Sequence, residues 1–353
     1  MIQVKPCYEI MNIPEPTDKM GVLKYLEEIG RVCYKSEDKI TDKSCIEFIN
    51  MIKNRKHWAM LEHYIFVFAV SKDIYDDIVN SHNWFHDQNN CDFIHAMDFI
   101  KYTYWHNPAD SNITYLVSAS ITALNYLWDC KVFEEDDSHG IVRICRFMKE
   151  LFPEAIMDPY GYQGIDTSGI RLLSRKEIES LPAGLRMIHD FCSVKFTVNR
   201  GVTHEIVRHR PASYAQESTR YCNYSPYSEE TTNGKDLRLM QPTFSGENSD
   251  ECIKLWNGMA EFVEECYNKM IALGATPQEA RAVLPNSTKA DIIMTARMWE
   301  WKHFFDMRVP ASAHPEMRQV TVPLVVDMNK RNHLFDDQVA LISKGDKKLC
   351  QNQ

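Results

Sequence analysis

The sequence predicts an α/β fold in which helices and strands follow one another along the chain. Two segments carry this prediction. Between residues 44 and 71, apolar residues recur at helical spacing and then form a short β-rich run, YIFVFAV, at 64–70. From 193 to 198 the apolar residues alternate as in a strand, and from 202 to 207 they return to helical spacing. We expect a helix followed by a buried strand in the first segment, and a strand followed by a helix in the second.

Between these two segments, residues 72 to about 190 are expected to form a largely helical insertion. The stretches 72–87 and 138–154 have the pattern of amphipathic helices, and 113–133 has that of a more buried helix. The chain shows no internal repeat. We therefore predict a single domain over residues 1–353, enlarged by this insertion.

The C-terminal third is predicted to be mainly helical. Residues 249–285 indicate a long helix that stops at Gly274 and a short helix that opens at 276–277. Residues 289–308 are predicted to be helical. Residues 314–330 are expected to begin either another helix or an extended run.

Composition excludes several classes of protein. With 49 acidic and 40 basic residues, the net charge is −9, which argues against a sequence-independent grip on a polynucleotide. The 11 cysteines are scattered, without CxxC pairs or Cys/His spacings of the zinc type, so we expect reduced thiols and no metal site. The N-terminus does not resemble a signal peptide, and no apolar run is long enough for a membrane span. The expected protein is soluble and cytoplasmic.

One stretch, RHRPASYAQESTRY at 208–221, concentrates positive charge in this acidic chain. Pro211 disfavours a helical conformation for Arg210, so the helix that includes 202–207 should end near 208–210. Cations at a helix C-terminus complement the helix dipole and need no ligand. That structural interpretation stays open for the three residues taken alone.

A second interpretation is an anion site. Residues 217–225 are predicted to be extended, and on an extended segment Ser218 and Arg220 face the same side. A hydroxyl beside a guanidinium can bind a phosphate, because the planar guanidinium offers two parallel donors to an oxyanion. The sequence therefore predicts a local site for a small phosphorylated ligand.

Arg208, His209 and Arg210, followed after seven residues by Ser218, match the signature of the flavin-dependent thymidylate synthases, the ThyX family. Other segments resemble the same family in consistent order along the chain, and these are 61–68, 196–224, 280–285 and 296–320. The resemblance implies a central, mostly antiparallel or mixed sheet flanked by helices, and a homotetramer whose active sites combine residues from several subunits.

The resemblance also implies a reaction. In this family dUMP is methylated at C5 to dTMP, with methylenetetrahydrofolate as carbon donor, FADH2 as hydride donor and NADPH as the reductant of the flavin. The protein would be a flavoprotein and a methyltransferase. All of these ligands carry negative charge, which accounts for a cluster of arginines.

Site residues are carried over from the family one by one. FAD would contact Arg208, His209, Arg210, Gln216, Thr295, Arg297 and His303. The nucleotide dUMP would contact Arg208, Gln216, Ser218, Arg220, Arg281 and Arg308. Arg308, Ser218 and His63 are expected at the reaction centre, with Ser218 binding the substrate rather than attacking it and no cysteine acting as nucleophile.

Several positions depart from the family pattern. The chain has Gln216-Glu217 before the signature serine, so the role of a carboxylate there is shifted or supplied by Gln216. Thr295 replaces a common asparagine, and Thr122 in SASITA stands where longer relatives have an arginine. These departures keep two alternatives open: a divergent methylase or hydroxymethylase acting on dCMP or dUMP, and a nucleotide-binding protein without catalysis.

Overall fold

The computed structural model describes residues 2–87, 100–106, 112–129, 139–157, 164–225, 237–343 and 346. It divides into two compact units. Unit 1 comprises Met1–Met11, Ile29–Lys39 and Ser193–Gln353, and unit 2 comprises Asn12–Glu28 and Ile40–Cys192. The predicted insertion lies within unit 2, and its description as an insertion into a single domain stays a prediction.

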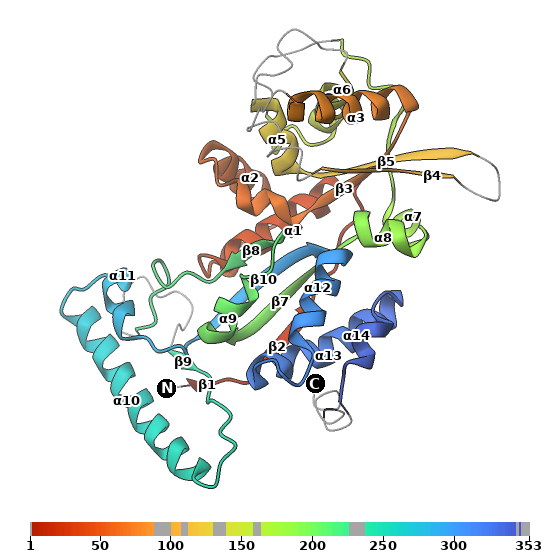
Figure 1. The fold of residues 1–353 in the computed structure, drawn as a ribbon. Helices are drawn as coiled ribbons and strands as arrows, with labels where there is room; N and C mark the ends of the chain where they lie inside the picture. The colour runs from red at the N-terminus through yellow and green to blue at the C-terminus, as the bar shows by residue number, and fades with distance from the viewer. Residues whose placement is uncertain are drawn as a thin grey trace. The chain divides into compact units, whose positions relative to one another are not determined.

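A four-stranded sheet forms the centre of unit 1, in the order β2, β7, β10, β8. The register pairs β2 with β7 antiparallel, placing Tyr8 opposite Phe196, and β10 with β8 antiparallel, placing Met294 opposite Tyr214. Helices flank this sheet (Figure 1). The predicted fold class is confirmed. The strands are β2 (Cys7–Ile10), β7 (Phe191–Asn199), β8 (Ser213–Gln216) and β10 (Lys289–Arg297).

Unit 1 also contains a small parallel pair formed by β1 (Ile2–Gln3) and β9 (Arg238–Leu239). Helix α1 (Lys19–Val32) contributes residues to both units. The remaining elements are η1 (Glu37–Lys39), α9 (Arg200–Ile206), α10 (Ser249–Ala272), α11 (Pro277–Ala280), η3 (Arg281–Val283), α12 (Met298–Arg308), α13 (Pro315–Asn332) and α14 (Asp336–Ala340).

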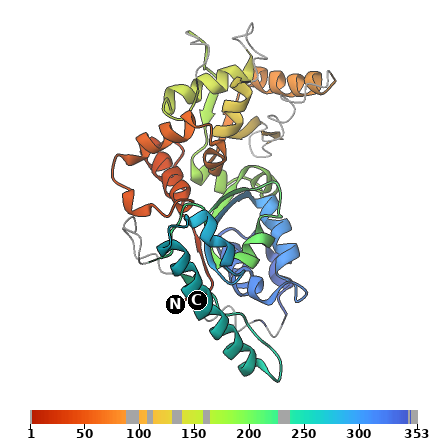
Figure 2. The same cartoon turned by 90° about the vertical axis from the view of Figure 1, so that its left-hand side faces the viewer.

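The predicted long helix and short helix are confirmed as α10 and α11. Gly274 has φ of +97°, a conformation that glycine adopts without steric cost, and its N–H donates a 2.9 Å hydrogen bond to the Ile271 carbonyl. Thr276 and Glu279 then form a reciprocal capping box that starts α11. Long α10 is drawn in teal in Figure 2.

The segment 289–308, predicted to be helical throughout, is a strand followed by a helix. Its first nine residues form β10, and all nine are buried. A strand buried on both faces shows no alternation, and such a run cannot be distinguished from a buried helix by periodicity. Residues 314–330 are helical, which settles the alternative left open there, because α13 covers them almost entirely.

Aromatic packing holds α12 on the sheet of unit 1. Trp301 lies 6.3 Å from Phe196 of β7, measured between ring centroids, and also contacts Phe304 and Phe305 of its own helix. All four side chains are fully buried. Tyr8 of β2 donates a 2.6 Å hydrogen bond to Asp327 of α13. These contacts fix the helix whose last residue is Arg308.

Unit 2 contains a second four-stranded sheet, in the order β4, β5, β3, β6, whose described pairings are all antiparallel. Its strands are β3 (Ile65–Val70), β4 (Lys101–His106), β5 (Ile113–Ser120) and β6 (Ile170–Leu172). Its helices are α2 (Ser44–Asn54), η2 (Trp58–His63), α3 (Lys72–Asp87), α5 (Ile121–Asp129), α6 (Gly140–Leu151), α7 (Arg175–Glu179) and α8 (Ala183–His189).

The helix and strand predicted between residues 44 and 71 are confirmed as α2 and β3, and α3 and α6 confirm two helices of the insertion. The stretch 113–133 differs from its prediction. It begins with strand β5 and becomes helical only at Ile121. Strand β5 lies between β3 and β4, and its last five residues are all buried, so the alternation that identifies a half-buried strand is absent there.

In the part of the chain that the structure describes, no helix is long and apolar enough to cross a membrane. The same residues contain no group of three or more His, Cys, Asp or Glu side chains able to hold a metal ion. The eight cysteines among them are free thiols.

Candidate functional site

The three-residue motif Arg208-His209-Arg210 occupies the turn between α9 and β8 in unit 1. The side chain of Asn199 caps the start of α9 by accepting from the Val202 N–H at 2.8 Å. The helix ends at Ile206, slightly earlier than predicted, and the cations follow its C-terminus as expected. Arg208 and Arg210 are exposed, whereas His209 between them is buried.

His209 is held from several sides. Its Nε2 accepts a 2.9 Å hydrogen bond from Nε of Arg308. Its ring packs edge-on against that of Phe304, and its ring centroid lies 5.7 Å from that of His303. Because arginine is always a donor, Nε2 is unprotonated and Nδ1 carries the hydrogen. Nδ1 is buried and has no hydrogen-bond partner among the described residues. A buried donor of this kind needs an acceptor, which either ordered water or a ligand atom can supply.

The ionisation of His209 is shifted strongly. Burial, the charge of Arg308 and the neighbouring His303 lower its pKa to about 4. The imidazole is therefore neutral at physiological pH. It offers a fixed N–H donor rather than a positive charge.

This shift predicts a pH dependence of stability. Below pH 6.5, the usual pKa of histidine, the unfolded chain protonates His209, whereas the folded protein does so only near pH 4. The stability that neutral His209 contributes is complete above pH 6.5 and is lost as the pH falls towards 4. We expect urea unfolding to show a larger loss of stability between pH 7.5 and pH 5 in the wild type than in His209→Gln. Equal losses in the two proteins would contradict the assignment.

Arg308, at the end of α12, is fixed by a carboxylate as well as by His209. Its Nη1 forms a 2.5 Å ion pair with Glu205 of α9, and its Nη2 lies 3.4 Å from the Glu205 carbonyl oxygen. The guanidinium is half-buried. Glu205 was not predicted. Its only signal in the sequence was its place three residues before Arg208, which says nothing of a partner more than a hundred residues away.

Ser218 and Arg220 lie in a turn, and the prediction of an extended segment at 217–225 is wrong. The Ser218 carbonyl accepts from the N–H groups of Tyr221 and Cys222, at 3.2 and 3.0 Å. The Ser218 hydroxyl accepts from the Arg220 N–H at 3.3 Å. Serine side chains often bond to the backbone two residues on and so favour turns over strands. The turn nevertheless keeps the Ser218 side chain against the Arg220 backbone, with Arg220 exposed and Ser218 partly so.

The other predicted residues of unit 1 occupy varied surroundings. Gln216 of β8 donates to the Thr203 hydroxyl at 2.9 Å, which ties the strand to α9. The Thr295 hydroxyl is buried, 2.5 Å from that of Ser193. Arg297 precedes α12 and is buried, and burial lowers its pKa to about 10 against the opposing charge of Glu300. Arg281 is exposed in η3.

Two residues singled out in the sequence lie in unit 2. His63 is buried at the end of η2, directly before β3. Thr122, which replaces the arginine of longer relatives, is buried in α5 and donates a 2.6 Å hydrogen bond to the Trp58 carbonyl. The role expected of His63 stays a prediction.

Comparison with known proteins gives similarity to one family. The family model described as thymidylate synthase complementing protein matches residues 181–331. A flavin-dependent thymidylate synthase from Pyrococcus horikoshii is 31% identical over 181 residues, which cover 49% of this chain and 72% of the relative. One from Pyrococcus furiosus is 29% identical over 176 residues, which cover 48% and 69%.

Among solved structures, a UMP/dUMP methylase from Streptomyces cacaoi bound with 5-bromo-dUMP is similar at a TM-score of 0.37 and 16% sequence identity. The match covers 49% of this chain and 82% of that one. A likeness this distant supports no inference about the ligand of this chain.

Proposed function

The chain belongs to the flavin-dependent thymidylate synthase family, and we propose on that basis that it methylates dUMP at C5 to form dTMP. The observation that carries the proposal is the pair formed by Arg308 and buried His209 beside two exposed arginines. Burial and the charge of Arg308 keep the imidazole neutral, and the hydrogen bond from Arg308 to Nε2 leaves Nδ1–H as a donor without a protein partner among the described residues.

A flavin fits this cluster. The N–H at Nδ1 of His209 needs an acceptor, and the carbonyl and ring nitrogen atoms of an isoalloxazine are acceptors. Arg208 and Arg210, on either side, supply the positive charge that an anionic reduced flavin and a pyrophosphate require. Arg210 is positioned by Tyr214, because its guanidinium lies over that ring at 5.8 Å. When bound, the reduced flavin supplies the hydride.

For the nucleotide, we assign the phosphate to Ser218 and Arg220, assisted by Gln216, Arg208 and Arg281, and the pyrimidine to Arg308. The turn holds the Ser218 hydroxyl against the backbone N–H of Arg220, whose side chain is exposed and lies over the ring of Tyr221 at 5.5 Å. Arg308 presents a guanidinium that is held by Glu205 and His209 and is therefore preorganised for a planar ring with carbonyl oxygens.

The proposed function also includes two co-substrates, a homotetrameric assembly and a cytoplasmic location. Methylenetetrahydrofolate would supply the one-carbon unit and NADPH would reduce the flavin, in a cytoplasmic homotetramer. One face of α10 supports self-association, since it exposes the large apolar side chains of Leu255, Met259 and Phe262 at helical spacing.

The proposal is tested by release of tritium from C5-labelled dUMP, with C5-labelled dCMP in parallel, in the presence of FAD, NADPH and methylenetetrahydrofolate. We expect release from dUMP alone, and loss of that release in Arg208→Ala. Arg331→Ala, which removes an exposed arginine of α13 far along the sequence from the motif, is the control and should retain it. Release from dCMP alone would move the function to cytosine modification, and release from neither would overturn the enzymatic proposal.

A further inference from the structure

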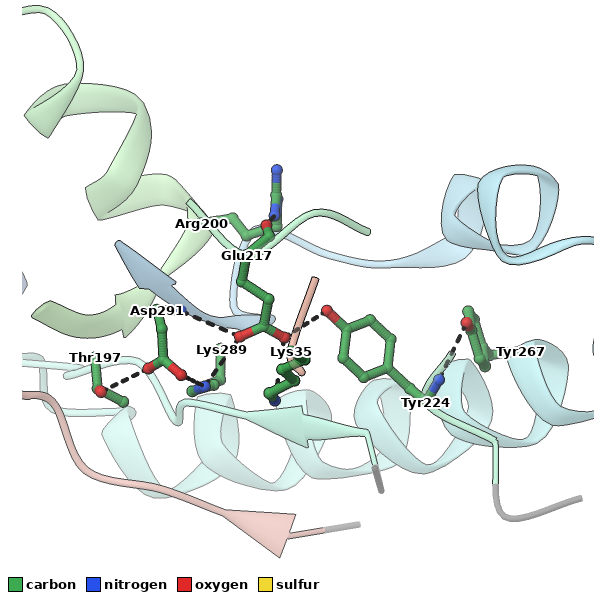
Figure 3. A network of polar contacts seen from close by, with 8 residues as sticks. All are labelled: Lys35, Thr197, Arg200, Glu217, Tyr224, Tyr267, Lys289 and Asp291. Carbon is green, nitrogen blue, oxygen red and sulfur yellow. Dashed lines mark hydrogen bonds and ion pairs between the residues drawn. The ribbon is translucent and has the colours of Figure 1, made fainter. Parts of the chain in front are cut away.

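A buried network of charges lies directly beside the turn that carries Ser218. At its centre is the carboxylate of Glu217, which is 1% exposed (Figure 3). Its Oε1 accepts from the Tyr224 hydroxyl at 2.7 Å and pairs with Nζ of Lys35 at 3.2 Å. Its Oε2 accepts from Nζ of Lys289 at 3.0 Å and from the Asp291 N–H at 3.2 Å. Both oxygens of the carboxylate are therefore satisfied.

The network continues through Lys289 to a second carboxylate. Lys289 also pairs with Asp291, whose other oxygen accepts from the Thr197 hydroxyl at 2.7 Å. Two lysines thus face two carboxylates, so the formal charges of these four side chains cancel. Burial alone would favour the neutral acid, but Lys289 and Lys35 keep the pKa of Glu217 below its ordinary value. Removing one partner from such a set leaves an uncompensated buried charge.

Residues of the network, and the segment that carries Lys35, also bind the backbone of the turn. The Glu217 N–H donates to the Asp291 carbonyl at 2.8 Å, and the Ser218 N–H donates to the Cys33 carbonyl at 3.1 Å. Lys35 comes from the same short segment as Cys33, and that segment approaches the turn again where the rings of Tyr34 and Tyr221 lie 5.4 Å apart. The residue before Ser218 is fixed by both its backbone and its side chain.

The position of Glu217 creates an electrostatic problem for a phosphate site. A carboxylate next to Ser218 repels a phosphate dianion unless its charge is compensated. Arg200, whose Nη1 lies 3.5 Å from the Glu217 carbonyl, does not compensate it, because its guanidinium points away from the carboxylates (Figure 3). Lys289 and Lys35 are the cations that contact the carboxylate.

We propose that Lys289 and Lys35 are positioning residues for nucleotide binding: they neutralise Glu217 and hold the turn of Ser218 and Arg220 in the shape that accepts a 5′-phosphate. This inference rests on the proposed function, since that function assigns the phosphate to the turn. Neither lysine needs to touch the nucleotide. Their effect passes through Glu217.

The test compares Lys289→Met, Glu217→Gln and the double variant. The readout is the ratio of the affinities for dUMP and deoxyuridine, measured on the full-length protein, because this ratio isolates the contribution of the phosphate. We expect Lys289→Met to lower the ratio by about tenfold or more, because two carboxylates then face Lys35 alone and a net negative charge comes to lie beside the phosphate. Glu217→Gln should change it by less than about threefold, and the double variant should recover most of the loss, because Lys35 and Asp291 then leave the network without net charge.

The control is Lys269→Met, which breaks an exposed Lys-Glu pair on α10 and should leave the ratio unchanged. If Lys289→Met does not fold, Lys35→Met and its combination with Glu217→Gln give the same comparison at a more exposed lysine. A double variant as weak as Lys289→Met would overturn the inference, because a merely structural loss is not rescued by removing the carboxylate. A wild-type protein that binds dUMP and deoxyuridine equally would also overturn it.

Failure of the proposed function is distinguishable from these outcomes. If the protein releases no tritium from dUMP, yet the ratio falls in Lys289→Met and recovers in the double variant, the positioning role stands and the methylation does not. If tritium is released but the ratio is insensitive to all three variants, the methylation stands and the positioning role does not.

Discussion

Replacing Arg308 with methionine is expected to lower kcat/KM for dUMP by about a hundredfold or more, the magnitude typical of removing a preorganised charged donor from an active site. Arg308 joins two groups that have no substitute partner in the described structure: it donates to Nε2 of His209 and pairs with Glu205. Without it, the imidazole loses the contact that fixes its tautomer, and Glu205 is left as an uncompensated charge near an anionic substrate.

Arg308→Lys should be almost as impaired. An ammonium group is a single point charge and cannot reach Glu205 and His209 together in the geometry of a planar guanidinium. The measurement is the initial rate of tritium release against dUMP concentration, with the flavin absorbance recorded in parallel. Lys302→Met, on the same helix, breaks only an i,i+4 surface pair with Asp306 and is expected to stay within about twofold of the wild type. Retention of more than about a tenth of the activity in Arg308→Met would contradict the assignment.

The sequence predicted those elements whose signal is local. Helix α10 ends at Gly274 and α11 opens with the Thr276-Glu279 capping box, because a left-handed residue and a cap act within one turn of chain. Strand β10 could not be predicted in the same way. All nine of its residues are buried, so the alternation that identifies a half-buried strand is absent.

In the candidate site, too, the contiguous residues could be predicted from the sequence and the contacts between distant strands could not. The motif residues from Arg208 to Arg220 are contiguous, and their association needed only the resemblance. Glu217 was left without a role because its partners are set by the register of β8 against β10, which places Gln216 opposite Ile292 and so brings Glu217 to Lys289. A register between distant strands depends on the packing of whole faces and is not readable from either strand alone.

The largest effect on stability is expected from Trp301→Ala. Trp301 is fully buried and packs against Phe196 of β7 and against Phe304 and Phe305 of its own helix. Removing a large aromatic side chain from such a core loses its transfer free energy and leaves a cavity, which together cost about 3–5 kcal/mol of unfolding free energy. Because α12 ends in Arg308, the same change should also loosen the contact between Arg308 and His209 and weaken flavin binding.

Trp299, two residues earlier on α12, is the matched control because its side chain is 60% exposed. Trp299→Ala should change the unfolding free energy by less than about 1 kcal/mol, since an exposed side chain leaves no cavity when it is removed. Urea unfolding of both variants, followed by far-ultraviolet circular dichroism, makes the comparison. Equal losses of unfolding free energy in the two variants would mean that the Trp301 face of α12 does not pack on the sheet. The placement of Arg308 beside His209 would then lose its structural basis.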